Sequence, residues 1–166
     1  MARYTNIYTN MWGDNKLEEL SDSDKLFWIY LLTNNSTNLC GYYILPSNSV
    51  LSDLGKTKEQ KEKHLAVLSE LGLIEYDTKS QALLIKNYLK YNTLKGANQY
   101  KAVAAQVKII TPNRTYIDFF LALCKHASDC IPYMGDHFKE YVKMNKGTDE
   151  SPRTLRLNTF IDTYYK

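Results

Sequence analysis

The segment 57–86 constrains the fold of this chain most, because it encodes three elements in immediate succession. It opens with a capping-box sequence, in which the Thr57 hydroxyl can accept an amide proton of the first helical turn while Gln60 reaches back to the backbone. The helix that follows carries leucines on one side and ends at Gly72, where a left-handed backbone costs least. Three short segments then predict a strand, a polar turn and a returning strand: 73–77, 78–81 and 82–86. A helix followed directly by a β-hairpin is typical of the second half of a winged helix-turn-helix.

The residues upstream of this segment complete the same pattern. The helix predicted for 22–33 has Leu26, Ile29, Tyr30 and Leu32 near one side and is apolar nearly all round, which favours a central helix packed on more than one face. A short strand at 41–45 and a helix at 46–55 follow, and Trp12 is expected to anchor the core in front of them. The resulting order of helix, strand, helix, helix, strand and strand agrees with a winged helix-turn-helix in element lengths, caps and turns.

Helical spacing predicts four more helices after the hairpin, at 98–110, 115–126, 134–144 and in the tail that follows a polar linker at 145–153. We therefore expect a mainly α-helical α+β fold with a small β-hairpin wing. Its predicted units are a winged helix-turn-helix (1–92), a basic linker and helix (93–114) and a C-terminal helical appendage (115–166). The strongly apolar helix 115–126 is either the buried centre of that appendage or a subunit interface. We expect a homo-oligomer, since a small DNA-binding unit gains affinity through avidity.

The net charge is only +3, but it is distributed unevenly along the chain. Residues 1–77 carry more acidic than basic side chains, whereas residues 78–117 carry seven basic side chains and no acidic one. This stretch without a carboxylate is the strongest electrostatic signal in the sequence. Its lysines can neutralise phosphates and release counterions, and the tyrosines between them can stack on bases. The alternative is that the tyrosines belong to the core and the lysines to an ordinary surface.

Three stretches carry a recognisable pattern: LSDSDKLFWIYLLTNNSTNLCGYYILP (20–46), LSELGLIEYD (68–77), and LLIKNYLKYN with NQYKAV (83–103). They resemble the N-terminal winged-helix domain of phage replisome-organiser proteins, relatives of the DnaD-type primosomal proteins of Gram-positive bacteria. The resemblance implies a phage or prophage origin, DNA binding, and a role in origin recognition or helicase recruitment. It also implies a host helicase loader or primosome component as a partner, in the bacterial cytoplasm. At Lys61 and His64 the sequence departs from the small apolar residues usual in that family, and the resemblance fades after residue 112.

Candidate DNA contacts lie at two helix starts and along the acid-free stretch, where amides, helix dipoles and lysines favour phosphate. They are Ser47, Asn48, Lys56, Lys58, Gln60, Lys63, Lys79, Lys86, Lys90, Lys95, Lys101 and Lys108. Double-stranded DNA is the expected partner, with single-stranded DNA as an alternative. However, the outward face of the helix after Thr57 also carries Glu59 and Glu70, and carboxylates are unfavourable beside a polyanion. A solvated helix face, a module that binds a host replication or defence protein, and a transcriptional repressor therefore remain alternatives.

The sequence indicates neither catalysis nor a metal or other cofactor. The seven glycines are isolated, so no phosphate-binding loop is present, and no set of residues predicts a catalytic triad. Cys124, His126, Cys130 and His137 form a tempting cluster, but Cys124 lies about 200° from His126 around a helix, which argues against zinc. The odd number of cysteines favours a reducing compartment. No apolar run approaches about 18 residues and the N-terminus lacks an apolar signal core, so we expect a cytoplasmic protein with no membrane partner. Since no catalytic pattern is present either, we expect this protein not to be an enzyme.

Overall fold

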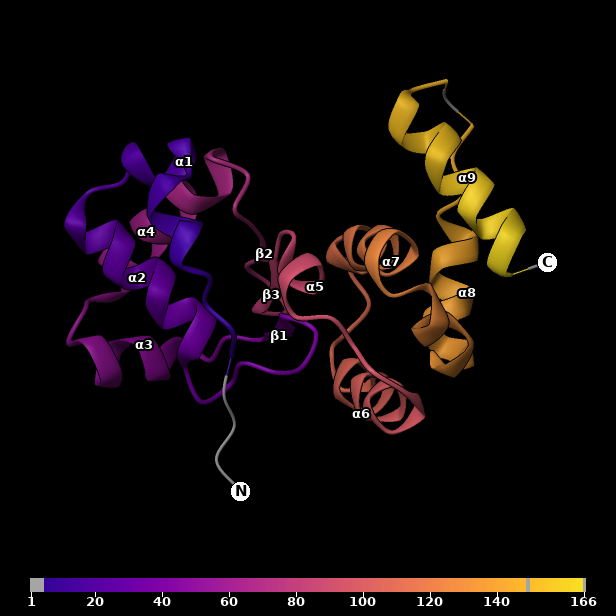
Figure 1. Ribbon diagram of the computed structural model, residues 1–166, viewed down its shortest axis with the longest axis horizontal. Helices are drawn as coiled ribbons and strands as arrows, with labels where there is room; N and C mark the ends of the chain where they lie inside the picture. Colours follow the sequence, from indigo (N-terminus) through magenta and orange to yellow (C-terminus); the bar gives the residue numbers. More distant parts are fainter. Residues whose placement is uncertain (1–4, 149, 166) are drawn as a thin grey trace.

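The chain folds around a small antiparallel sheet that has helices on both sides (Figure 1). The computed structural model describes residues 5–148 and 150–165, so the parts of the predicted units that fall on 1–4, 149 and 166 lie outside the described residues. The strands pair in the order β1–β3–β2, with bounds Tyr42–Ile44 (β1), Ile74–Asp77 (β2) and Ala82–Ile85 (β3). The predicted class, a mainly helical α+β fold, is confirmed.

Helices make up most of the described chain. Before the hairpin they are the 3₁₀ helix η1 (Thr9–Gly13), α1 (Asn15–Glu18), α2 (Asp22–Thr33), α3 (Ser47–Leu54) and α4 (Lys58–Glu70). After the hairpin they are α5 (Tyr88–Tyr91), α6 (Ala97–Lys108), α7 (Thr115–His126), the 3₁₀ helix η2 (Ser128–Tyr133), α8 (Asp136–Met144) and α9 (Pro152–Tyr164). The four helices predicted after the hairpin correspond to α6, α7, α8 and α9, whereas α5 and η2 have no counterpart among the predicted elements.

The helix and hairpin of segment 57–86 form as the sequence predicts. The Gln60 amide donates to the Thr57 hydroxyl at 3.3 Å, and the Thr57 amide donates to Gln60 Oε1 at 2.9 Å, so both hydrogen bonds of the capping box are present. Gly72 follows α4 with a φ of +65°, the left-handed conformation that glycine adopts most easily. Strands β2 and β3 then pair in antiparallel register around the turn at 78–81.

Alternate residues of β3 belong to two different hydrophobic clusters. Leu83 and Ile85 pack with residues of α1 to α4, while Ala82 and Leu84 pack with residues of α6 to α9. Because side chains alternate between the faces of a sheet, this sheet is one layer shared by two cores, and all four residues of β3 are buried. The division into units 1–92, 93–114 and 115–166 stays a prediction. Residues of the first and the last of these units pack against opposite faces of the same sheet.

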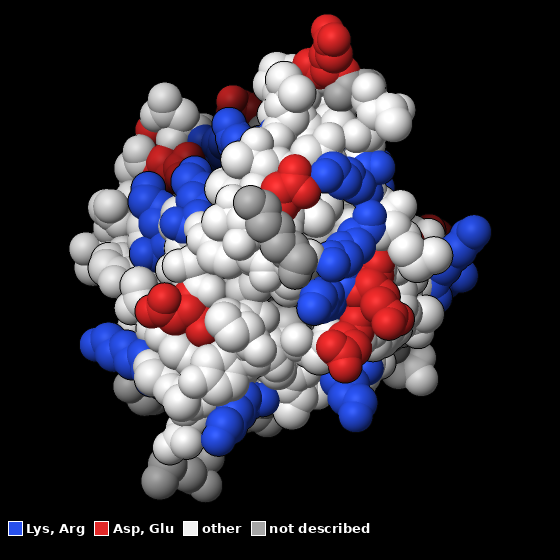
Figure 2. Space-filling view, turned by 90° about the vertical axis from the view of Figure 1, so that its right-hand side faces the viewer, with Lys and Arg blue, Asp and Glu red and all other residues white. Residues whose placement is uncertain are grey.

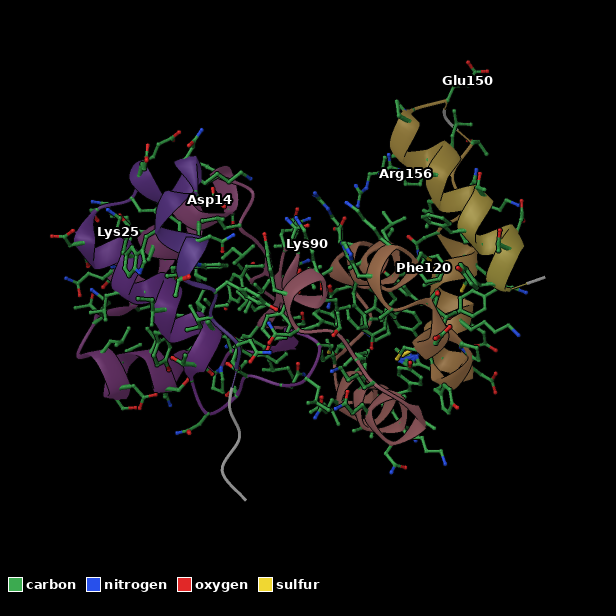
Figure 3. All side chains as sticks on the ribbon, viewed as in Figure 1. Asp14, Lys25, Lys90, Phe120, Glu150 and Arg156 are labelled. Atoms are coloured by element: carbon green, nitrogen blue, oxygen red, sulfur yellow. The ribbon has the colours of Figure 1, made fainter. Side chains whose placement is uncertain are left out.

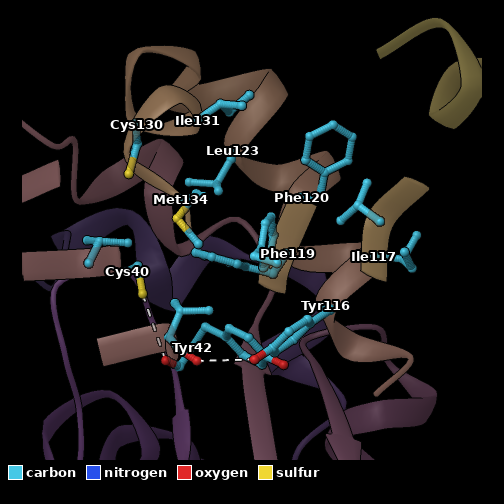
Figure 4. Packing of buried hydrophobic residues seen from close by; sticks show 14 of the residues in the cluster. Cys40, Tyr42, Tyr116, Ile117, Phe119, Phe120, Leu123, Cys130, Ile131 and Met134 are labelled. Carbon is cyan, nitrogen blue, oxygen red and sulfur yellow. Dashed lines mark hydrogen bonds between the residues drawn. The ribbon is translucent and has the colours of Figure 1, made fainter. Parts of the chain in front are cut away.

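Helix α7 is the buried centre of the C-terminal core. The Phe119 ring of α7 stacks on the Tyr42 ring of β1 with centroids 4.8 Å apart (both residues are labelled in Figure 4). The Phe120 ring stacks on the Tyr165 ring with centroids 5.4 Å apart. The Tyr42 hydroxyl also lies 2.6 Å from the Thr115 hydroxyl at the start of α7. The helix predicted as either a buried centre or a subunit interface is thus buried within the chain, where it joins the C-terminal helices to the sheet.

One predicted core position is wrong, and one apolar residue of α2 is exposed. Trp12 is 59% exposed, because η1 buries none of its residues and the neighbouring Leu17 of α1 fills the core instead. Leu26 is 53% exposed, because α2 turns the adjacent stripe with Phe27 and Leu31 into the interior. In a helix that is apolar nearly all round, the sequence alone does not determine which stripe faces the core.

Candidate nucleic-acid interface

The outward face of α4 is the first surface predicted to meet DNA. Lys58 and Lys63 are exposed on it, as the sequence predicts. However, a Glu62 carboxylate oxygen lies 3.9 Å from the Lys58 ammonium, and Glu59 and Glu70 are exposed as well. The face therefore carries both signs of charge, and its lysines do not form a continuous positive surface.

Three of the predicted contact residues are engaged within the protein. The Lys56 ammonium donates to the Ser23 hydroxyl at 2.9 Å, and the Gln60 carbonyl oxygen is used in the capping box. The Ser47 hydroxyl accepts a hydrogen bond from Gln81 Nε2 at 2.9 Å. These contacts connect α2, α3, α4 and the hairpin turn, so the three side chains stabilise the fold in the positions they occupy.

The two residues of α4 that depart from the family pattern are buried. Lys61 is 3% exposed, its ammonium lies 3.5 Å from the Tyr76 hydroxyl, and burial lowers the pKa of Lys61. His64 Nδ1 lies 2.6 Å from an Asp24 carboxylate oxygen, and the His64 ring stacks on Phe27 with centroids 5.0 Å apart. Both residues face the interior, so neither contributes to an external binding surface.

Two of the predicted DNA contacts are exposed at the hairpin tip and at the start of α3. Lys79 is exposed in the turn, and Asn48 is exposed at the start of α3. The turn is held by Asp77, whose carboxylate accepts from the Ser80 amide at 2.7 Å, and hydrogen bonds from Ser80 lower the pKa of that carboxyl. Asn113 Nδ2 also donates to the Ser80 hydroxyl at 3.0 Å. The tip is therefore tied to the segment before α7 and has a fixed position.

The acid-free stretch does not form one positive strip. Lys101 and Lys108 are exposed on α6, and Lys95 precedes that helix. Lys86 and Lys90 lie instead around the junction of β3 and α5, while α6 lies below α7 in the view of Figure 1. Figure 2, which looks onto the C-terminal helices, shows Lys and Arg in separate groups with Asp and Glu between them. The predicted cations are thus distributed over several elements.

A groove of about 500 Å³ opens between the β3–α5 junction, α7 and α9. Three elements contribute cations to its lining, with Lys86 directly after β3, Lys125 in α7 and Arg156 in α9. Leu121 of α7 and Phe160 of α9 supply apolar surface to the same lining. We call this site the basic groove. It is the place where the fold brings together cations that are far apart in the sequence.

Two of the cations around the basic groove are already paired with carboxylates. Arg153 Nη2 donates to Asp118 Oδ1 at 2.7 Å, and the Lys86 ammonium lies 4.0 Å from the same oxygen. Lys86 also lies 2.9 Å from a Glu75 carboxylate oxygen of β2. These pairs link the hairpin, α7 and α9, and they leave Lys86 with less capacity to neutralise a ligand than the sequence suggests.

Two cations of the lining and one beside it have no such partner. In the described part of the chain, no carboxylate oxygen lies within 4 Å of Lys90, Lys125 or Arg156. Lys125 and Arg156 belong to the lining, whereas Lys90 of α5 lies outside it (Lys90 and Arg156 are labelled in Figure 3). His126 also lines the groove, where burial and then the charges of Lys125 and Lys90 lower its pKa. The groove therefore has an excess of positive charge that an anion would neutralise.

The residues of the groove that come from α7 and α9 are absent from the predicted set. Residues 118–166 hold equal numbers of basic and acidic side chains, so their composition carries no electrostatic signal. Helical spacing offers a partial signal. Asp118 and Lys125 are seven residues apart on one face of α7, and Arg153 and Arg156 are three residues apart on one face of α9. That the two faces meet is a tertiary fact that spacing does not reveal.

The cysteines have the properties of buried thiols. Burial raises the pKa of Cys40 and of Cys124 to about 12 and that of Cys130 to about 11, so these groups are protonated near neutral pH. Within residues 5–148 and 150–165, no group of three or more His, Cys, Asp or Glu side chains is placed to hold a metal ion.

None of the protein-family models, curated proteins or solved structures compared with this chain matches it. Among the described helices, none is both long enough and apolar enough to cross a membrane. The geometry of the basic groove is consequently the observation on which a functional interpretation rests.

Proposed function

We propose that this protein binds nucleic acid through the basic groove and catalyses no reaction. The observation that carries the proposal is that Lys125 and Arg156 line one groove, with Lys90 of α5 close enough to act on His126 in the same lining. These three cations come from three helices and have no carboxylate partner in the described residues. Cations held in this way attract phosphate, because each phosphate they neutralise releases condensed counterions into solution. Contacts of this kind give affinity and little sequence choice, so the binding tolerates many sequences.

The N-terminal elements support a second, weaker part of the proposal. Their order of helix, strand, helix, helix and hairpin fits a winged helix-turn-helix, with α4 as recognition helix and the hairpin as wing. In that arrangement Asn48, Lys58, Lys63 and Lys79 would make additional contacts with a duplex. The resemblance to phage replisome organisers extends the proposal to phage replication in a bacterial cytoplasm, as an initiator or a helicase-recruiting adaptor that self-associates.

A charge-reversal experiment with a matched control tests the proposal. One variant combines Lys90→Glu, Lys125→Glu and Arg156→Glu in the groove. The control combines the exposed Lys95→Glu, Lys101→Glu and Lys108→Glu around α6, which changes the formal charge equally. Fluorescence anisotropy at low salt should show binding of labelled oligonucleotides by the control, weakened less than tenfold, and almost none by the groove variant.

The same experiment can refute the proposal in two ways. Equal losses in the two variants would mean that binding follows the net charge and that the groove is not the site. Failure of the unaltered protein to bind single-stranded or double-stranded oligonucleotides at low salt would refute nucleic-acid binding itself. Circular dichroism of each variant confirms that the comparison is made between folded proteins.

A protein-binding role for α4 is the second candidate function, and the exposed carboxylates of its outward face favour it. Glu59, Glu62 and Glu70 offer an acidic surface that suits a basic partner, such as a host replication or defence protein. A pull-down from nuclease-treated host lysate should then recover a partner in stoichiometric amount. Substitution of Glu59→Lys and Glu70→Lys should abolish that recovery, whereas the groove variant should retain it.

A further inference from the structure

Asp118, which lines the basic groove, has a carboxylate oxygen without a hydrogen-bond donor. Asp118 lies in the first turn of α7 with a side chain that is 10% exposed, and its Oδ1 accepts the hydrogen bond from Arg153. Its Oδ2 is buried, and no donor among the described residues lies within hydrogen-bonding distance of it. Buried acceptors are nearly always satisfied in folded proteins, so an exception beside a groove indicates a donor that a ligand could supply.

The surface next to Asp118 suits a flat, apolar ring. Leu121 and Ala122 of α7 and Phe160 of α9 line the groove, and its volume of about 500 Å³ falls within the range of sites that hold small organic groups. A nucleobase has apolar faces that pack on aliphatic and aromatic side chains, and its polar groups are confined to the ring edge. Lys125 and Arg156 in the same lining can meet the phosphates on either side of such a base.

The shape of the groove distinguishes single strands from duplexes. In a duplex the bases are stacked and their Watson–Crick edges are paired, so only phosphates could reach the groove. An unpaired base of a single strand can turn outward and enter it. The terminal torsion of an aspartate side chain is soft, so a modest rotation can bring Asp118 Oδ2 toward an entering base.

We propose that the basic groove is a subsite for one unpaired guanine of a single-stranded nucleic acid, with Asp118 Oδ2 as the acceptor that selects it. This inference rests on the proposed function, since it assumes that phosphates bind the groove. Guanine is the base whose Watson–Crick edge offers two adjacent N–H donors, N1–H and the N2 amino group, to a group that can only accept. Thymine and cytosine offer fewer donors there, and adenine presents a ring acceptor that would face the carboxylate.

Short oligonucleotides provide the test, because a long strand would blur the contribution of a single base. Pentanucleotides with two thymidines on each side of a central guanine, hypoxanthine, adenine, cytosine or thymine are titrated against the whole protein by anisotropy. The guanine pentamer should bind about tenfold more tightly than the thymine pentamer, as a hydrogen bond to a charged acceptor implies. Hypoxanthine, which keeps N1–H but lacks the amino group, should bind with intermediate affinity.

Substitution of Asp118→Asn should bring the ratio of guanine to thymine affinities close to one. The ratio is the readout because the substitution also releases Arg153 and changes the affinity for every strand. If Asp118→Asn does not fold, the series of bases measured on the unaltered protein still decides the matter. A matched duplex with the same central base should show no dependence on its identity.

Two results would overturn the inference while leaving the proposed function intact. The first is equal binding of all five pentamers by a protein that binds longer strands in the groove. The second is a guanine preference that survives Asp118→Asn in the folded variant. If no strand of any length binds, the proposed function and this inference fail together.

Discussion

The salt dependence of binding provides a quantitative prediction from the pairing of the groove cations. For single strands, each neutralised phosphate contributes about −0.7 to the slope of log affinity against log salt concentration. Lys90, Lys125 and Arg156 are free of carboxylates in the described part of the chain, so the slope for a short oligothymidine should be about −2. Lys125→Gln removes one free cation and should reduce the slope to about −1.4.

The paired Lys86 is the matched control for that measurement. Its ammonium lies 2.9 Å from Glu75 and 4.0 Å from Asp118, so its charge is already balanced within the protein. Lys86→Gln should weaken binding at every salt concentration, because Glu75 loses its cationic partner and Asp118 keeps only Arg153, but should leave the slope close to that of the unaltered protein. Anisotropy titrations across a series of potassium chloride concentrations measure both slopes. An unchanged slope for Lys125→Gln, or an equal fall for both variants, would refute this division into free and paired cations.

Three further predictions concern stability and pH. Gly41→Ala should lower the free energy of unfolding by at least about 2 kcal/mol in urea titrations, because Gly41 has a φ of +65° and the added Cβ would collide with the Tyr88 ring. Gly13→Ala, whose added Cβ meets nothing within 4 Å, should change it by less than about 0.5 kcal/mol. Lys61→Met should raise the free energy of unfolding by about 1 kcal/mol, since it removes a buried ammonium that has no carboxylate partner in the described residues; a loss of stability would contradict this. The lowered pKa of His126 keeps it neutral at pH 7, so its protonation should strengthen oligonucleotide binding as the pH falls from 7 to 5, and His126→Gln should flatten that pH profile.

Local chemistry explains why the centre of the fold was predictable. The capping box at Thr57 and the left-handed stop at Gly72 are determined by residues a few positions away, and the hairpin follows from alternation and a polar turn. Val103, Val107 and Ile110, which are spaced three or four residues apart in the helix predicted for 98–110, are buried, as one side of a helix would be. These signals do not show which side of a helix that is apolar nearly all round faces the core. For this reason the exposure of Leu26 could not be predicted.

The candidate site was less predictable because it depends on contacts between distant segments. The absence of acidic residues from 78 to 117 drew attention to the lysines of that stretch, but it could not show that Asp118, the next residue after the stretch, lies 4.0 Å from Lys86. Arg156 joins Lys125 in the groove only because α9 packs beside α7. A count of charges along the chain cannot reveal a groove whose cations come from separate helices.

The most direct test of the account is to map where a single-stranded oligonucleotide contacts the protein by ¹H–¹⁵N chemical-shift perturbation. We predict the largest shifts around Lys90, Lys125 and Arg156, with weaker effects on the exposed lysines of α6. Shifts concentrated on α4 and the hairpin tip, around Lys63 and Lys79, would contradict the account and would favour recognition by the winged-helix surface.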